Sequence, residues 1–305
     1  MDISALINKL ILLFFTLAVG FIAAKCGVLN QNSNKMLSSL VVNVTNPLQI
    51  LASVMVSERL LTNLQVLELT GINAACYVAL ILVGWLLARL LRAPEQDRRV
   101  YQFMLVFSNV GFLGYPLAEA LLGVSAKFCI TISVLCFQLV CWTYGAHLME
   151  GGERFRFSWR FLLRPCVFSS LLAYGIYLSG LSLPPIAAQA ANYVGDLTSP
   201  IAMLIIGVSL AQISARTIFG NWRIYVLCIV KLMLLPLAVW AALRGIVTSP
   251  LMLSTVVLAQ CMPVATNTTI LCYQFGRDEQ VGSSGVFLST MIALASIPAM
   301  MSLLF

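Results

Sequence analysis

Long apolar runs alternate with short polar segments along the whole chain. Most runs approach the roughly 20 residues that a helix needs to cross about 30 Å of hydrocarbon. None shows the alternating polarity of a membrane-spanning strand. The pattern predicts ten transmembrane helices. They cover Leu6–Lys25, Met36–Val56, Val66–Leu91, Tyr101–Gly123, Phe128–Met149, Phe161–Leu181, Ala191–Ala211, Ile224–Gly245, Leu251–Tyr273 and Val281–Leu304.

Composition leads to the same fold class. Hydrophobic residues make up 60% of the 305 residues, charged residues make up 10%, and the mean hydropathy is +0.96. A water-soluble globular domain does not tolerate such a balance. The sequence therefore indicates an all-α polytopic membrane protein with short loops.

The net charge of +7 follows from an uneven distribution of Lys and Arg. One predicted side carries most of these residues, clustered around Arg98 and Arg160, whereas the opposite side holds only Lys9, Arg59, Lys127 and Arg244. Cytoplasmic loops are enriched in positive charge. We therefore expect a multi-pass protein of the cell inner membrane with both termini outside. Insertion explains the charge, so no nucleic-acid partner is expected.

The chain contains an internal repeat. The segment "NVTNPLQIL" at 43–51 matches "DLTSPIAML" at 196–204, with Thr45 aligned to Thr198 and Pro47 to Pro200. This offset predicts two five-helix repeats, residues 1–149 and 161–305, joined by a short cytoplasmic linker at 150–160. An odd number of helices makes the second repeat enter the membrane from the opposite face, as in inverted-repeat transporters.

Two predicted spans are interrupted near their middle. Span four contains "FSNVGFLGYPL" and span nine contains "MPVATNTTI", and Gly and Pro weaken or remove main-chain hydrogen bonds in both. Each break alone could be a proline kink whose freed carbonyls bind nearby Thr and Asn. Two breaks at equivalent places instead favour broken crossover helices with a substrate site where they cross. The candidate residues are Asn109, Gly111, Gly114, Pro116, Pro263, Thr266, Asn267 and Thr268.

Further polar residues lie within predicted spans. Lys231 either has a buried partner or function, or extends its side chain to the headgroups. Three interpretations of Asp196 are open: a partner for Lys231, a proton-binding group, or a helix-start aspartate near the interface. Glu119, at the outer end of span four, is a second candidate for proton or ion coupling. Asn43 and Asn46 are three residues apart, so we expect them to share one cavity-facing side of the helix.

Four stretches, "SNVGFLGYPL", "TSPIAMLIIGVSLA", "KLMLLPL" and "MPVATNTTILCYQFG", together resemble the auxin efflux carrier family, whose bacterial members include malate and malonate permeases. The resemblance implies the architecture of bile-acid and sodium–proton transporters, with spans one, two, six and seven as a scaffold and the other six as a transport domain. It also implies a homodimer. Asn109, Pro116 and Pro263 match the residues of the family's crossover. The linker, Glu150 to Arg160, is far shorter than the hydrophilic loop of plant carriers, which argues against auxin as the natural substrate.

The residues favour a secondary active or facilitative transporter for small organic anions, such as mono- or dicarboxylates and auxin-like acids, that works by alternating access. Helix N-termini and Asn or Thr donors suit a carboxylate. A sodium-coupled organic-anion symporter of the same architecture is the alternative. An intramembrane enzyme is not expected because no H-E-x-x-H, paired buried Asp or phosphate loop is present. No cofactor and no metal site are expected.

Overall fold

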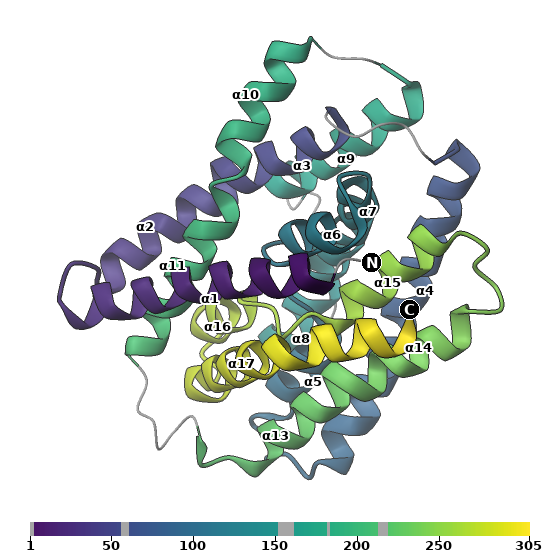
Figure 1. Cartoon of the computed structure of the whole chain (residues 1–305). Helices are drawn as coiled ribbons and strands as arrows, with labels where there is room; N and C mark the ends of the chain where they lie inside the picture. Colours follow the sequence, from purple (N-terminus) through teal and green to yellow (C-terminus); the bar gives the residue numbers. More distant parts are fainter. Residues whose placement is uncertain (1–2, 56–60, 152–161, 182–183, 213–218) are drawn as a thin grey trace. The chain divides into compact units, whose positions relative to one another are not determined.

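The apolar runs form helices, which satisfy their own main-chain polar groups as a bilayer requires. A computed structural model of the chain describes residues 3–55, 61–151, 162–181, 184–212 and 219–305 (Figure 1). Across these ranges every regular element is a helix. Close contacts divide the chain into two compact units, residues 1–70, 111–138 and 158–212, and residues 71–110, 139–157 and 213–305.

The first unit consists of helices from both halves of the sequence. They are α1 (Ile3–Lys25), α2 (Gln31–Leu40), α3 (Asn46–Met55), α6 (Gly114–Leu122), most of α7 (Ala126–Val140), α9 (Pro165–Ser179), α10 (Pro185–Gly195) and α11 (Thr198–Ala211), with a π-helical turn, η1 (Val41–Thr45), between α2 and α3. Helix α1 packs along α11, and α3 packs against both α9 and α10 (Figure 1).

Small residues allow the close approach of α1 to α11. A Cβ atom added to Gly20 would lie 2.5 Å from the carbonyl oxygen of Leu204, and one added to Gly207 would lie 2.7 Å from the main-chain nitrogen of Phe21. Membrane helices commonly place glycine where two backbones meet in this way. These two glycines therefore permit the close contact between α1 and α11.

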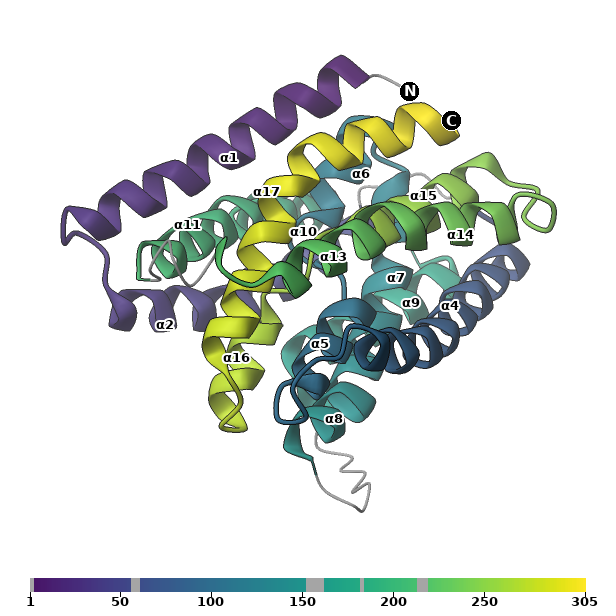
Figure 2. The ribbon, with the colours of Figure 1, turned by 90° about the horizontal axis from the view of Figure 1, so that it is seen from below.

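The second unit also draws on both halves. Its helices are most of α4 (Asn63–Leu90), α5 (Arg98–Val106), α8 (Ala146–Glu150), α13 (Trp222–Ile229), α14 (Leu235–Leu243), α15 (Pro250–Cys261), α16 (Asn267–Gln274) and α17 (Glu279–Leu304), with π-helical turns η2 (Cys141–Gly145) and η4 (Val230–Leu234). Helix α17 runs beside α13 and α14 (Figure 2) and also packs against α5, α15 and α16.

Some of the predicted spans are covered by one long helical segment, whereas others contain only shorter helices. In the described ranges, seven segments are long and apolar enough to cross a membrane: Ile7–Lys25, Gln31–Met55, Asn63–Leu90, Ala126–Glu150, Pro185–Ala211, Trp222–Leu243 and Glu279–Leu304. The remaining three predicted spans contain shorter helices. Spans four and nine are each broken into two helices, and span six contains the 15-residue α9, with its start outside the described residues. The chain is thus a multi-helix membrane protein, and the count of ten spans stays a prediction.

The two units differ from the two predicted repeats, because each unit combines segments from residues 1–149 and 161–305. The helices of spans one, two, six and seven all lie in the first unit, together with residues 111–138. Most of the predicted linker at 150–160 lies outside the described residues. The division into repeats therefore stays a prediction.

Candidate functional site

Both interrupted spans leave the helical conformation at the expected places. Helix α5 ends at Val106, and Phe107 is extended with φ −101° and ψ 116°. Helix α15 ends at Cys261, and Met262 is extended with φ −66° and ψ 145°. Met262 precedes Pro263, and a residue before proline is sterically driven from the helical region to the extended one.

The two breaks lie side by side within the second unit. Ser108 and Val264 form an antiparallel bridge. The N–H of Asn109 donates to the carbonyl of Pro263 at 2.8 Å, and the N–H of Ala265 donates to the carbonyl of Phe107 at 3.1 Å. Main-chain groups freed by one break are thus satisfied by the other. We call this pairing of residues 107–109 with 263–265 the crossover.

Helix α17 and the start of α16 support the crossover. The hydroxyl of Ser289 on α17, which is fully buried, accepts a hydrogen bond from the N–H of Val264 at 3.0 Å. The buried hydroxyl of Thr268 donates to the carbonyl of Ala265 at 2.7 Å. Thr268 therefore has a structural partner, whereas its neighbour Asn267 is half-buried at the first position of α16.

Lys231 lies against the crossover. Its side chain is 1% exposed, and its Nζ atom donates to the carbonyl of Leu105 and to Oγ of Ser108, both at 3.1 Å. The amino group is therefore buried among neutral oxygens, and the alternative that it reaches the headgroups is wrong. Lys231 belongs to the turn η4, and π-helical turns inside α-helices occur frequently at functional sites.

Two buried polar atoms of the crossover region have no hydrogen-bond partner among the described residues. They are Nδ2 of Asn109, whose side chain is 3% exposed, and Oγ1 of Thr266. Because buried polar groups are almost always paired, such atoms suggest a missing ligand or water. Both atoms can donate a hydrogen bond to an anion.

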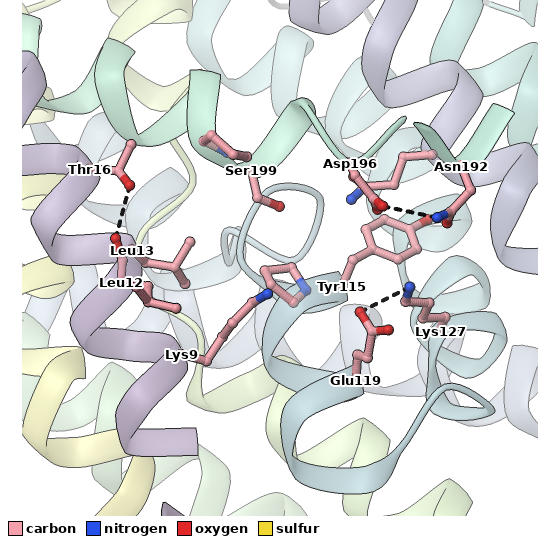
Figure 3. Close-up of a pocket in the computed structure, with 13 residues that line it drawn as sticks. Lys9, Leu12, Leu13, Thr16, Tyr115, Glu119, Lys127, Asn192, Asp196 and Ser199 are labelled. Atoms are coloured by element: carbon pink, nitrogen blue, oxygen red, sulfur yellow. Dashed lines mark hydrogen bonds and ion pairs between the residues drawn. The ribbon is translucent and has the colours of Figure 1, made fainter. Parts of the chain in front are cut away.

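A cavity of about 510 Å³ lies within the first unit (Figure 3). Its walls come from α1, α3, α6, α7, α10 and α11 and contain two lysines and two acids. The lining residues are Lys9, Leu12, Leu13, Thr16, Gln49, Tyr115, Pro116, Glu119, Lys127, Asn192, Asp196, Ser199 and Pro200. We call it the α6 pocket, because α6 supplies three neighbouring side chains of its wall, Pro116 and Glu119 among them.

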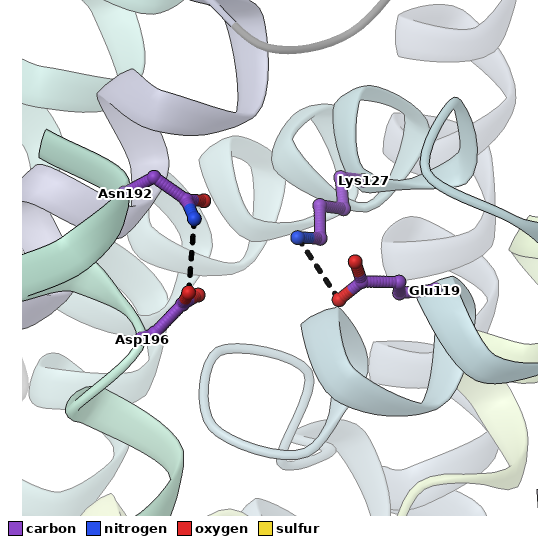
Figure 4. A network of polar contacts seen from close by, with 4 residues as sticks. All are labelled: Glu119, Lys127, Asn192 and Asp196. Atoms are coloured by element: carbon purple, nitrogen blue, oxygen red, sulfur yellow. Dashed lines mark hydrogen bonds and ion pairs between the residues drawn. The ribbon is translucent and has the colours of Figure 1, made fainter. Parts of the chain in front are cut away.

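Two polar pairs face each other in the α6 pocket (Figure 4). Nζ of Lys127 lies 2.9 Å from a carboxylate oxygen of Glu119. The side-chain amide of Asn192 donates to the carboxylate of Asp196 at 2.9 Å. Each acid therefore has a local partner, whereas Lys9 on α1 forms no ion pair with any residue that the structure describes.

Asp196 lies at the junction of two helices of one helical segment. This segment begins at Pro185, and its first helix, α10, ends at Gly195. The second helix, α11, begins at Thr198, two residues after Asp196. The interpretations of Asp196 as a helix-start aspartate or as a proton-binding group both stay predictions.

The expectation that Asn43 and Asn46 share one side of the helix is also wrong. Asn43 is exposed and donates from Nδ2 to the carbonyl of Ser39 at 2.9 Å, whereas Asn46 is buried. The reason is the π-helical turn η1, which holds more residues per turn than an α-helix and so rotates Asn43 away from Asn46.

Asn46 belongs to a second group of buried polar atoms, in the first unit. Its Oδ1 and Oε1 of Gln49 have no partner among the described residues, and a Cβ atom added to Gly111 would lie 3.8 Å from Nδ2 of Asn46. Gly114 begins α6. Sequence reasoning missed Gln49, although its spacing from Asn46 within α3 could have indicated it. It also missed Ser108 and Ser289, because isolated serines in apolar helices carry no signal of their own.

The repeat-related threonines meet within the first unit. The hydroxyl of Thr198 donates to the hydroxyl of Thr45 at 2.9 Å, across a separation of 153 residues. Both side chains are buried. The sequence alignment had matched these two residues, but nothing in it required them to touch.

The described part of the chain contains no group of three or more His, Cys, Asp or Glu that could hold a metal ion. All nine cysteines lie among the described residues, and none forms a disulfide. Eight of them are buried, where a free cysteine packs as a small apolar side chain.

Comparison with known proteins gives a consistent result. The sequence profile of the family described as "Membrane transport protein" matches residues 5–301. Two relatives are named uncharacterized transporters: a protein of Methanocaldococcus jannaschii is 24% identical over 95% of this chain and 96% of its own length, and one of Methanothermobacter thermautotrophicus is 28% identical over 92% of both. A Rhizobium meliloti protein named "Putative malonate transporter" is 24% identical over 75% of this chain and 74% of its own length.

Proposed function

Because this chain belongs to the Membrane transport protein family, we propose that it moves small organic anions across the membrane by alternating access. The family and the relatives are transporters, so the expectation that the chain is not an enzyme is confirmed. The substrate class and the mechanism are the proposal.

The observation that carries this proposal is the set of donors at the crossover. The Nδ2 atom of Asn109 is buried without a partner among the described residues, and the amino group of Lys231 donates to the hydroxyl of Ser108, the preceding residue. Burying an unpaired donor costs free energy that a carboxylate ligand would recover. Thr266 and Asn267 add a hydroxyl and an amide at the start of α16.

The α6 pocket supports a small, charged substrate. Its volume of about 510 Å³ falls within the range of roughly 300–1,000 Å³ typical of ligand pockets. Lys9 provides positive charge, whereas Lys127 is paired with Glu119, and Pro116 contributes to the wall of the pocket. Asn46 adds a polar group, Gly111 leaves space beside its backbone, and Gly114 begins α6; we assign these three residues to substrate passage.

The name of the Rhizobium meliloti relative supports a dicarboxylate among the candidate substrates. Malonate carries two carboxylates on one carbon and would require at least two groups of donors. We therefore take malonate as the first probe and include longer dicarboxylates, monocarboxylates and auxin-like acids as comparisons.

Alternating access rests on the proposed inverted repeat, which the helix bounds support. A shift of 153 residues carries α6, at 114–122, to 267–275, and α16 is Asn267–Gln274. The same shift carries α5, at 98–106, to 251–259, within α15 at Pro250–Cys261. The contact between Thr45 and Thr198, which are related by this shift, is the kind that a pseudo-two-fold axis generates.

Proton coupling through Asp196 or Glu119 is part of the proposal, since both acids line the α6 pocket. Placement in the inner membrane with both termini outside rests on the charge bias alone. Homodimer formation rests on the family resemblance.

Proteoliposomes test the function directly. Purified protein would be reconstituted, and uptake of labelled malonate, malate, a monocarboxylate and indole-3-acetate measured with and without imposed pH and Na⁺ gradients. We expect saturable uptake of at least one carboxylate, competed by the same unlabelled anion and absent from protein-free liposomes. Correctly folded protein that moves none of these anions above the protein-free level would reject the proposal.

A further inference from the structure

We propose that the Lys231 ammonium occupies a site built for a monovalent cation, so that this transporter carries a fixed charge where a symporter would bind sodium. The proposal deepens the proposed function, because it specifies how the anion site is balanced electrically. All residues from which the proposal is argued lie in the second unit.

The oxygens around Nζ have the chemistry of an alkali-cation site. Both partners of Lys231 are neutral, the carbonyl of Leu105 and the hydroxyl of Ser108, and each lies 3.1 Å away. Transporters bind Na⁺ with unwound main-chain carbonyls and the C-terminal ends of half-helices. Leu105 lies one residue before the end of α5, where the helix dipole places partial negative charge.

The break in span four creates this site. In a continuous helix the carbonyl of Leu105 would accept from the N–H of Asn109, four residues later. That N–H donates instead to Pro263 at 2.8 Å, and the N–H of Val110 donates to the carbonyl of Ser108 at 2.8 Å. The crossover therefore withdraws the donor that Leu105 would use, and Lys231 supplies a new one.

Capping alone does not explain the choice of lysine. A neutral side chain could donate to the same carbonyl, whereas a buried ammonium carries a large desolvation cost unless charge compensates it. Neither bond of Nζ goes to a carboxylate. An anionic substrate close to Asn109, the residue after Ser108, would provide the compensating charge, and the fixed cation would make a co-transported sodium ion unnecessary.

The test is the melting temperature of purified Lys231→Ala in detergent, in a series of NaCl concentrations against choline chloride at equal ionic strength. Removing the side chain opens the site, so Na⁺ should bind and stabilise the variant. At a concentration tenfold above the dissociation constant, linkage predicts a rise of about 2 °C over choline for a chain of 305 residues. Wild type should melt at the same temperature in both salts, because its site is filled.

Ser108→Ala in the Lys231→Ala background is the matched control. It removes one of the two oxygens, so the sodium-dependent rise should shrink or disappear. An equal melting temperature of Lys231→Ala in both salts would overturn the proposal, as would a saturable sodium effect in wild type or one that Ser108→Ala leaves intact.

If Lys231→Ala is too unstable to purify in choline chloride, the yield of folded protein after detergent extraction serves as the test. Recovery of a monodisperse protein in NaCl but not in choline chloride supports the site, and equal failure in both salts rejects it. Neither measurement needs a substrate. A sodium effect in a protein that transports no carboxylate would thus reject only the proposed function, and carboxylate uptake without a sodium effect would reject only the cation site.

Discussion

Replacing Asn109 by alanine separates its two roles at the crossover. The main-chain N–H of Asn109 holds the carbonyl of Pro263 at 2.8 Å, and alanine keeps this group. Its side-chain Nδ2 is buried without a partner among the described residues, and alanine removes it. The substitution should therefore leave the crossover folded while removing one donor from the proposed anion site.

The contacts set the expected magnitudes. Because Nδ2 has no partner to lose, stability should change by no more than about 1 kcal/mol, the small cavity being offset by relief of the buried unpaired donor. A hydrogen bond to a charged group contributes roughly 1.5–3 kcal/mol, which corresponds to a loss of affinity of about 10- to 140-fold.

The assay measures both quantities on the same purified protein. Binding of labelled malonate, or of whichever carboxylate the uptake panel identifies, gives the dissociation constant, and the melting curve in detergent gives the stability. Asn32→Ala is the matched control, because Asn32 is an exposed asparagine on α2. It should match wild type in both measurements.

The opposite pattern would refute this reasoning. If Asn109 merely caps carbonyls freed by the break, Asn109→Ala should melt several degrees lower and bind the carboxylate with wild-type affinity. That outcome would remove Asn109 from the binding site and leave it a structural residue.

Three further outcomes follow from particular contacts. Ser289→Ala should lower stability by about 1–3 kcal/mol in a melting assay, because the buried N–H of Val264 loses its acceptor; an unchanged melting temperature would show that water replaces it. Gly207→Ala should destabilise by about 1–3 kcal/mol because its Cβ meets the α1 backbone, whereas Gly71→Ala, with no atom within 4 Å, should be neutral or stabilising. Topology can be tested in a background that lacks the exposed native cysteine. There, Gln96→Cys should react with an impermeant thiol reagent only from the cytoplasm, and a cysteine added after the last residue should react only from outside. Reaction of both cysteines from the same side would contradict the topology.

Much of the architecture was visible in the sequence because the bilayer leaves few choices. A run of about 20 apolar residues must form a helix, since only a helix satisfies its own main-chain groups in hydrocarbon. Pro263 and the glycines around Gly111 predicted where two of these helices break. These are local rules, and local sequence is sufficient to apply them.

Side-chain placement could not be predicted in the same way. Asn43 and Asn46 were expected on one side of a regular helix, but the turn η1 separates them, and a π-helical turn has no composition that marks it. The helical segment around Asp196 starts at Pro185, six residues before the predicted span, because proline is accepted at the first position of a helix. Periodicity arguments fail wherever the period itself changes.

The sequence by itself determined that this chain is a helical membrane protein and that two of its helices break at polar, proline-containing segments, and it predicts that the two halves repeat. Only the tertiary structure decided what those breaks do. The pairing of Asn109 with Pro263 and the two bonds of Lys231 join segments more than 120 residues apart in the chain. A break in a helix releases main-chain donors and acceptors, which must find new partners. Which groups become those partners depends on the distant segment that packs against the break, and this packing is set by the fold as a whole.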